Sequence, residues 1–507
     1  MGVLFGKRNL IECCQMQIDN FISRVKYSFV FGSLKSSFSF LFSIYLSIIL
    51  DSKIYGFYIF LTATFISIKG FADLGISNAF NSYITRHDVL NEKVPFISTY
   101  LSIILFQITT VFSLMYILNC GGYLDNIFFT ENLSLVALGM LAVYLQQHFF
   151  SVSCQVLDSQ RENYKSQLSS LIAIIVLFLI VWIFNKFIIK DLKILFLMHI
   201  IIFSVATIIN LNGILKLEAF KFDLKIVRKY FSFSTPLLFN SFILLGFDFL
   251  DRWILQNYAG SYGQSTYQVA LQISSIPTIL MMSLNPIILK EFSAAFYNNE
   301  YEKLKSLYNK FILNTYFTVF TLCTIIFLFS DLIFLLIYGD KFPDGPVALR
   351  LLLFYTIFQC IGQINGSLLL ITGHTLDYFK SGLWGLVMST FLLLLLVGDN
   401  IPIYLGGKEI MLGLGLGAIG LSIKLPIVNL LIIGIQNRII QRNFNIKSLF
   451  SAILIKLISI VLFMCCIEYI FEIDFGFEVQ YLKLIAQFLI LITWIVFTYN
   501  KLRKLIE

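Results

Sequence analysis

Apolar runs of about 20 residues recur along almost the whole chain, and this repetition restricts the fold more than any other feature. Each run is long enough to cross the hydrocarbon core of a bilayer, about 30 Å thick, as an α-helix. The composition agrees, because 58% of the 507 residues are hydrophobic and 13% are charged, whereas soluble domains are about half apolar and about one quarter charged. The sequence therefore predicts an all-α polytopic membrane protein with about fourteen transmembrane helices.

The predicted spans are bounded by turn signals, which include Gly121-Gly122, Gly260, Pro343-Asp-Gly-Pro346 and Gly406-Gly407. The predicted spans are 27–50, 54–80, 94–118, 130–157, 166–186, 192–215, 231–258, 264–290, 311–337, 347–373, 379–398, 411–437, 447–470 and 480–500. The longest outer loops, at 119–130 and 398–410, have only about a dozen residues each. This pattern leaves no room for a soluble catalytic domain.

The distribution of Lys and Arg predicts the orientation of the chain. With the N-terminus in the cytoplasm, the inside segments hold about 24 of the 37 basic residues and the outside loops about 7. Both termini are therefore expected on the cytoplasmic side, and the net charge of +8 is mostly a topology signal. The first 26 residues lack the apolar stretch of a signal peptide, so the first span is expected to direct insertion.

The longest basic run, 216–230, divides the predicted spans into comparable halves. It is expected to be an amphipathic helix on an anionic cytoplasmic leaflet, with a solvated surface helix as the alternative. Short matches between the halves, such as Tyr164-Lys165-Ser166 and Phe379-Lys380-Ser381, favour a parallel repeat. The predicted organisation is two pseudo-symmetric six-helix bundles plus two C-terminal helices. Its parts are a first bundle at 1–215, a linker at 216–230, a second bundle at 231–440, and two further helices with a cytoplasmic tail at 441–507.

Several charged residues fall inside predicted spans, where each opposes insertion by about 2.5–3.5 kcal/mol and normally faces protein or water. They are Lys35, Lys69, Asp73, Asp248, Asp251, Arg252 and Lys424. Amide side chains at helical spacing accompany them, namely Gln268 and Gln272 in span eight and Gln363 in span ten. The pattern predicts a polar, water-filled cavity lined by helices from both halves.

A static role for some of these charges stays open. Lys69 and Asp73 are four residues apart, as are Asp248 and Arg252, so each pair could be an interhelical or intrahelical ion pair that only holds the bundle together. Lys35 and Lys424 have no evident acid in their own helix, and an unpaired buried cation invites an anionic partner. Gly413, Gly417 and Gly420 are expected to allow a close helix approach beside Lys424.

No pattern in the sequence indicates catalytic or metal chemistry. The eight cysteines include no CxxC pair. The histidines His87, His148, His199 and His374 are scattered, with no HExxH or triad spacing. We therefore expect no catalytic residue, no metal and no cofactor, with H⁺ or Na⁺ as a candidate coupling ion at Asp73, Asp248 or Asp251.

Motifs in order along nearly the whole chain resemble the polysaccharide-transporter branch of the multidrug/oligosaccharidyl-lipid/polysaccharide exporter superfamily, the O-antigen flippases. The stretches that carry this resemblance are Tyr55-Gly56-Phe57-Tyr58, Ala72 through Asn78, Asp251-Arg252, Tyr267 through Tyr308, Tyr338 through Arg350, and Gly417-Ala418-Ile419-Gly420. The resemblance implies two six-helix bundles, alternating access, and export of an undecaprenyl-diphosphate-linked oligosaccharide across the bacterial inner membrane. Lumen charges vary between members, so the substrate contacts of Lys35 and Lys424 are inferred from this sequence alone.

On this interpretation, Lys35, Lys69, Arg252 and Lys424 attract the diphosphate and acidic sugars, and the glutamines contact sugar hydroxyls. The expected partners are the lipid-linked substrate, membrane lipids, and the polymerase and chain-length regulator of the pathway, with no nucleic acid. One alternative is a drug/cation antiporter of the same superfamily, which favours an acid-dominated aromatic pocket. Another is a membrane polysaccharide polymerase, which needs a large outer loop that this chain lacks.

Overall fold

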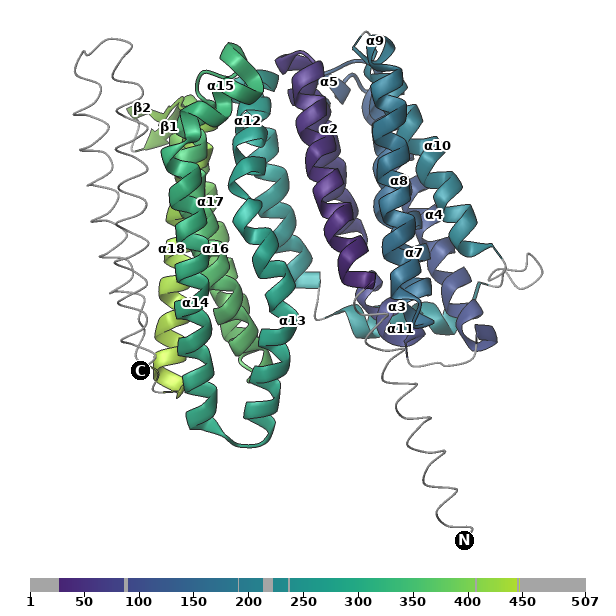
Figure 1. Ribbon diagram of the computed structural model, residues 1–507. Helices are drawn as coiled ribbons and strands as arrows, with labels where there is room; N and C mark the ends of the chain where they lie inside the picture. The colour runs from purple at the N-terminus through teal and green to yellow at the C-terminus, as the bar shows by residue number, and fades with distance from the viewer. Residues whose placement is uncertain are drawn as a thin grey trace. The chain divides into compact units, whose positions relative to one another are not determined.

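The computed structural model describes residues 27–85, 90–189, 191–212, 222–235, 238–405, 408–444 and 446 (Figure 1). Ten helices within these residues are long and apolar enough to cross a membrane. The predicted helical, multi-pass membrane fold is confirmed. The last two predicted spans, 447–470 and 480–500, lie outside the described residues.

The chain divides into two compact units, Met1–Ser265 and Thr266–Glu507. The first unit begins with the helix Tyr27–Ile49. It continues through α2 (Ser52–Ala72), α3 (Ile76–Ile84), α4 (Leu90–Cys120), α5 (Leu124–Phe128), α6 (Leu133–Tyr144), the π-helix η1 (Leu145–Phe150), α7 (Ser151–Ser159), α8 (Asn163–Ile183), α9 (Asn185–Ile188), α10 (Leu192–Leu211), α11 (Leu224–Ser234) and most of α12 (Leu238–Ser274).

The second unit is built from the end of α12 and the elements after it. They are α13 (Ile276–Tyr297), α14 (Tyr301–Leu328), α15 (Ser330–Tyr338), the 3₁₀ turn η4 (Gly339–Lys341), α16 (Gly345–Ile371), α17 (Thr375–Leu396), β1 (Asp399–Leu405), β2 (Lys408–Leu414) and α18 (Gly417–Phe444). Helix α16 packs against α13, α14 and α18, and α17 packs against α18. The predicted six-helix repeat with its boundary at 216–230 stays a prediction.

Asp and Asn side chains define where several helices start. In each case the side chain accepts a hydrogen bond from a backbone N–H of the first turn, which would otherwise lack a partner. These N-cap residues are Asp51 for α2, Asn132 for α6, Asp191 for α10 and Asp223 for α11. The short connections of the first unit are therefore fixed locally by sequence.

The second predicted span is interrupted, contrary to the expectation of one helix over 54–80. Helix α2 ends at Ala72, and α3 begins at Ile76. Between them, Leu74 and Gly75 have positive φ angles of 51° and 79°, a conformation that ends a right-handed helix. The predicted turn at Gly260 is confirmed, since Gly260 (φ 63°, ψ −167°) breaks the helical geometry inside α12.

The predicted outer loop at 398–410 is wrong in part, because it contains a β-hairpin. Strands β1 and β2 pair antiparallel, with Ile401 opposite Leu412 and Ile403 opposite Ile410. The Gly406-Gly407 signal between them is typical of a tight hairpin turn. The hairpin was missed because strands of seven residues give a much weaker pattern than the long apolar runs around them.

The end of the first unit that contains α3 and α11 has its own hydrophobic core. Residues of α3, α4, α7 and α11 form one buried cluster, in which the rings of Phe80 and Tyr100 stack with centroids 4.6 Å apart. Tyr230 of α11 is fully buried within it. Helix α11 is therefore a packed part of this unit.

Candidate functional site

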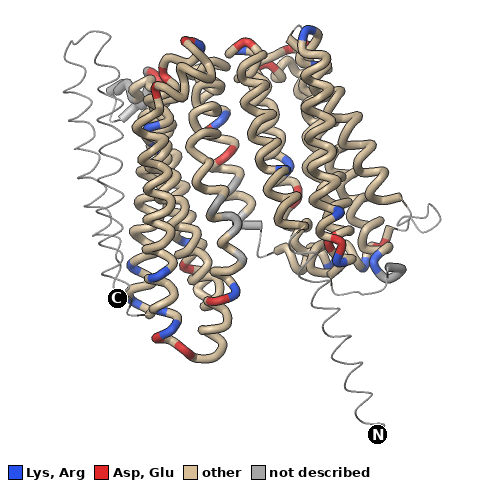
Figure 2. The backbone as a smooth tube through the Cα atoms, viewed as in Figure 1, with Lys and Arg blue, Asp and Glu red and all other residues tan. Residues whose placement is uncertain are grey.

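Charged residues gather at the ends of the helices, while a smaller number lie part-way along them (Figure 2). The polar break after α2 contains a buried carboxylate, that of Asp73, which is 4% exposed. Asp73 Oδ2 accepts hydrogen bonds from Ser77 N at 3.1 Å and from Ser77 Oγ at 2.6 Å. Asp73 Oδ1 accepts one from the Tyr100 hydroxyl of α4 at 2.9 Å. Gln107 of α4 donates to the carbonyl of Ala72 at 2.8 Å, so α4 satisfies both sides of the break.

This geometry decides one alternative that the sequence left open. The Asp73 carboxylate accepts from Ser77 and Tyr100, and among the described residues its side chain makes no ion pair or hydrogen bond with the Lys69 side chain. Its charge still acts on Lys69 through space. Lys69 is half-buried near the end of α2. Its ammonium group forms no static ion pair with Asp73.

Another cation of this unit, Lys93, has a structural role. Lys93 is 1% exposed, and its Nζ donates to Ser159 O at 2.8 Å and to Ser159 Oγ at 3.2 Å. It thereby binds the C-terminal end of α7, where the helix dipole favours a positive charge. The sequence predicts an inside loop at Lys93 and does not predict its burial.

The continuous rod of α6, η1 and α7 carries polar groups that the sequence analysis missed. Four of its side chains each have a buried atom with no hydrogen-bond partner among the described residues: Tyr144 Oη, His148 Nε2, Gln155 Oε1 and Asp158 Oδ1. Charges on neighbouring helices act on this face, Lys69 on His148 and Lys35 on Asp158. Unsatisfied buried polar atoms are costly, and π-helical turns are frequent at functional sites.

Two of the predicted site residues, the half-buried Lys35 and Lys69, belong to the same unit as this rod. The sequence does not single out His148, because the four histidines form no catalytic motif. The signal that could have found it was the spacing of Tyr144, His148 and Gln155 at helical steps along the predicted span 130–157, with Asp158 directly after it.

A His148→Leu variant tests whether the polar face is kept for function. Burying His148 Nε2 without a partner costs about 1–3 kcal/mol, which an apolar side chain avoids. We therefore expect His148→Leu to raise the thermal unfolding midpoint in detergent while lowering the transport that the sequence resemblance implies. Ser153→Ala on the same rod is the contrasting variant, since Ser153 Oγ donates to Phe150 O at 2.7 Å and accepts from Asn210 Nδ2 at 3.0 Å. Its loss should lower the midpoint. A variant that gained stability and kept full transport would show that the face has no function.

The charges of α12 all precede its break at Gly260. Asp251 is 8% exposed, Asp248 is exposed and Arg252 is half-buried. Arg252 Nη1 donates to Gln264 Oε1 at 3.2 Å, and Gln264 Nε2 donates to Arg252 O at 2.5 Å. Arg252 therefore joins the two parts of α12 across Gly260, and its pairing with Asp248 stays a prediction.

The second unit holds the remaining predicted site residues. Gln272 is 9% exposed, while Gln268 and Gln363 are half-buried. Lys424 of α18 is fully buried. The predicted close helix approach beside it is confirmed at Gly420, where a Cβ would lie 2.5 Å from the carbonyl oxygen of Leu396 in α17.

A neutral polar network in the second unit was not predicted. The Tyr308 hydroxyl of α14 donates to Asn365 Oδ1 of α16 at 2.8 Å, and Asn365 Nδ2 donates to Asn437 Oδ1 of α18 at 3.1 Å. Asn437 Nδ2 is buried with no partner among the described residues. The network joins three helices by side chains that were too far apart in sequence to be associated.

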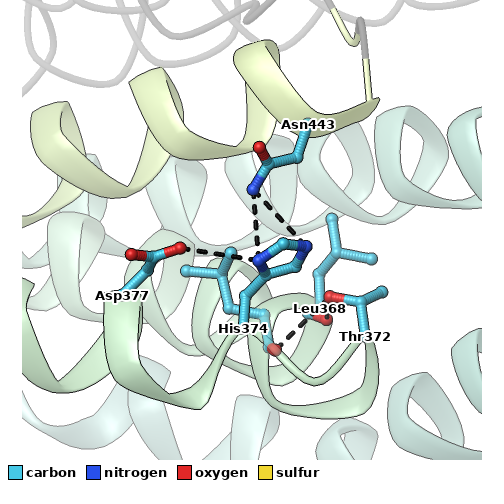
Figure 3. Close-up of polar contacts among 6 residues, drawn as sticks. Leu368, Thr372, His374, Asp377 and Asn443 are labelled. Atoms are coloured by element: carbon cyan, nitrogen blue, oxygen red, sulfur yellow. Dashed lines mark hydrogen bonds and ion pairs between the residues drawn. The ribbon is translucent and has the colours of Figure 1, made fainter.

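His374, one of the scattered histidines, joins the start of α17 to the end of α18 (Figure 3). Its Nδ1 lies 3.5 Å from Asp377 Oδ2, and Asn443 Nδ2 lies 3.2 Å from His374 Nδ1 and 3.4 Å from Nε2. The Phe444 ring contacts the imidazole edge to face, with centroids 5.6 Å apart. The side chains of His374 and Asp377 are about one third exposed, 34% and 39%, so this contact is open to water.

The predicted site residues thus fall into two sets. Lys35, Lys69, Asp73, Asp248, Asp251 and Arg252 belong to the first unit, and Gln268, Gln272, Gln363 and Lys424 belong to the second. The described residues contain no cluster of His, Cys, Asp or Glu that could hold a metal ion. Half-buried ammonium groups beside polar side chains can attract anions.

Comparison with protein families gives a match over residues 23–289, which is more than half of the chain. The matching family is described as polysaccharide biosynthesis protein. Among curated proteins, no match is found.

Solved structures with a similar fold are membrane transport proteins. The lipid II flippase MurJ, in an inward closed conformation, is 16% identical with a TM-score of 0.65, covering 94% of this chain and 100% of that chain. A multidrug resistance MATE family transporter of the MOP superfamily, in an inward-facing conformation, is 14% identical with a TM-score of 0.64, covering 81% of this chain and 94% of that chain. An outward-facing structure of such a transporter gives 14% identity and a TM-score of 0.56, with coverage of 84% and 95%. At these identities the likeness concerns the fold.

Proposed function

The chain belongs to the polysaccharide biosynthesis protein family and has the fold of the MOP superfamily, and from this premise we propose that it is a flippase. Its substrate is an undecaprenyl-diphosphate-linked oligosaccharide repeat unit of the O-antigen or capsule type. It carries this substrate across the bacterial inner membrane by alternating access, with both termini in the cytoplasm. The resemblance drawn from the order of sequence motifs is confirmed for family and fold.

The observation that carries the proposal is the state of Lys69. Lys69 lies half-buried in a predicted span. The nearest acid along the chain is Asp73, whose carboxylate accepts hydrogen bonds from Ser77 and Tyr100. A membrane-embedded cation without a static counter-ion is costly unless an anion visits it. A diphosphate supplies that anion, and Lys35 in the same unit provides a second positive charge.

The other predicted roles follow from the same mechanism. Arg252 and Lys424 add positive charge to the substrate path, and Gln268, Gln272 and Gln363 donate to sugar hydroxyls. Lys424 is fully buried in this conformation, so its part requires a helix movement that exposes it. Asp251 and Asp248 are the better candidates for a coupling H⁺ or Na⁺, because Asp73 is engaged in capping α3. No cofactor takes part, and the polymerase and chain-length regulator of the pathway are the proposed partners.

A Lys69→Gln variant is expected to lose about 10- to 100-fold in transport, because an ion-assisted hydrogen bond to phosphate contributes about 1.5–3 kcal/mol. The measurement is polymer at the surface of cells that depend on this chain, together with the amount of unpolymerised lipid-linked unit left on the cytoplasmic side. Lys69→Arg should keep most of the transport, because it keeps the charge. Lys53→Gln is the matched control, since Lys53 is exposed at the other end of α2.

Several results would contradict the proposal. If Lys69→Gln, Lys35→Gln and Lys424→Gln each left export unchanged, the cationic path would be wrong. Single units displayed outside the cell in a strain lacking the chain would indicate a polymerase. Resistance to cationic drugs conferred by the chain, with normal polymer export in its absence, would favour the drug/cation antiporter.

A further inference from the structure

Helix α11 is fixed to the first unit through one of its faces. Ile226, Tyr230 and Ser234 recur every four residues and are buried. The Tyr230 hydroxyl donates to the carbonyl of Phe96 in α4 at 3.0 Å, and burial raises the pKa of Tyr230 far above its usual range, which keeps it a neutral donor. The backbone N–H of Asp223 donates to Thr99 Oγ1 at 3.2 Å. These contacts set which side of α11 points outward.

The outward side combines positive charge with apolar groups. Lys225, Arg228 and Lys229 are all exposed. Leu224 is 71% exposed and Phe231 is 41% exposed. The segment Leu224–Ser234 contains no Asp or Glu. The neighbouring Asp223 carboxylate already accepts a hydrogen bond from Lys225 N at 2.7 Å.

This combination is poorly suited to contact with water alone. Exposed Leu and Phe side chains gain by entering an apolar layer, whereas Lys and Arg gain from nearby negative charge. An interfacial helix satisfies both, because its apolar groups enter the acyl boundary while its cations meet the headgroups. Helix α11 packs on α3 and on the first turns of α4, next to the ends of helices long enough to span the membrane.

We propose that the outward face of α11, formed by Leu224, Lys225, Arg228, Lys229 and Phe231, binds the headgroups of anionic phospholipids at the membrane surface. The occupant is identified by charge complementarity, since Lys225, Arg228 and Lys229 are exposed together on a helix that contains no Asp or Glu after its N-cap Asp223. The binding anchors the core of α3 and α4 to the leaflet through the fixed position of Tyr230. It does not depend on which substrate the chain transports.

The test uses the purified full chain in a neutral detergent. Short-chain phosphatidylglycerol, which is anionic, is titrated against short-chain phosphatidylcholine, which is neutral overall, and retained lipid is counted by native mass spectrometry. Each cation near a membrane surface contributes about 1 kcal/mol, so K225Q/R228Q/K229Q should lower the apparent affinity for phosphatidylglycerol about a hundredfold. Affinity for phosphatidylcholine should change little.

A matched variant removes the same charge elsewhere. K303Q/K305Q/K310Q takes three cations from α14, in the other unit, and should retain the affinity for phosphatidylglycerol. Because Lys229 Nζ also lies 5.9 Å from the centroid of the Phe96 ring, the double variant K225Q/R228Q leaves that contact intact and should still lose about tenfold or more. Hydrogen exchange at Ile226 and Tyr230 checks that α11 stays docked.

Three outcomes would overturn the proposal. The first is equal retention of the two phospholipids by the unaltered chain. The second is an equal loss in the α11 and α14 variants. The third is saturable binding of inorganic phosphate to α11 with the affinity of phosphatidylglycerol, which would assign the face to free phosphate.

Discussion

Asp73→Ala is expected to lower the free energy of unfolding by about 4 kcal/mol, since hydrogen bonds to a buried carboxylate contribute about 1.5–3 kcal/mol each. The substitution leaves the Tyr100 hydroxyl and the backbone N–H of Ser77 without their acceptor. Ser77 lies in the first turn of α3, so the substitution also weakens the start of that helix. The measurement is the unfolding midpoint of the full chain in detergent, followed by fluorescence or calorimetry.

Two further substitutions make this prediction specific. Asp73→Asn keeps one acceptor oxygen for Tyr100 or Ser77, so its cost should be clearly smaller than that of Asp73→Ala. Asp51→Ala removes the exposed N-cap of α2, whose side chain accepts from Lys53 N at 2.9 Å, and should cost only about 1 kcal/mol. Equal losses for Asp73→Ala and Asp51→Ala would show that Asp73 acts as an ordinary cap.

Gly56→Ala should be at least as damaging, although it adds a single methyl group. A Cβ at Gly56 of α2 would lie 1.7 Å from the carbonyl oxygen of Ser261 and 2.6 Å from its carbonyl carbon. Both atoms belong to backbone, so α2 and the segment after Gly260 would have to separate. Overpacking of this kind costs about 3 kcal/mol or more, and we expect loss of stability together with loss of transport.

The same helix supplies the control for this prediction. Gly70 also lies in α2, and nothing is within 4 Å of a Cβ placed there. Gly70→Ala should therefore stabilise the chain by about 0.5–1 kcal/mol, because alanine is the better helix former. A stable, active Gly56→Ala variant would mean that α2 does not pack against Ser261 in the working protein.

The helices could be predicted from sequence because the signal for a membrane span is local. An apolar run of sufficient length needs no partner to identify it, and Gly260 marks its turn by a backbone conformation that glycine tolerates. The importance of Gly56 was visible only as part of a family motif. Its cause, the approach of Ser261, depends on a residue more than two hundred positions further along the chain.

The polar sites were harder to predict because their partners are remote. Lys69 and Asp73 have the spacing of a helical ion pair, but the hydroxyl of Tyr100, 27 residues beyond Asp73, takes one carboxylate oxygen. The burial of Lys93 depends on Ser159, 66 residues away. Sequence spacing therefore identified the charged residues, while tertiary contacts decided which charges are satisfied.

The π-helix η1 between α6 and α7 has a consequence for movement. A π-helical turn accommodates one more residue than an α-helical turn. The residues after η1 are therefore shifted around the helix axis relative to the positions they would have in a regular α-helix. If η1 relaxed to α-helical geometry, everything beyond it would rotate by about 100° around the rod axis. Gln155 and Asp158 would then leave the face that carries Tyr144. Such a change would turn the polar groups of α7 relative to those of α6 without bending the rod.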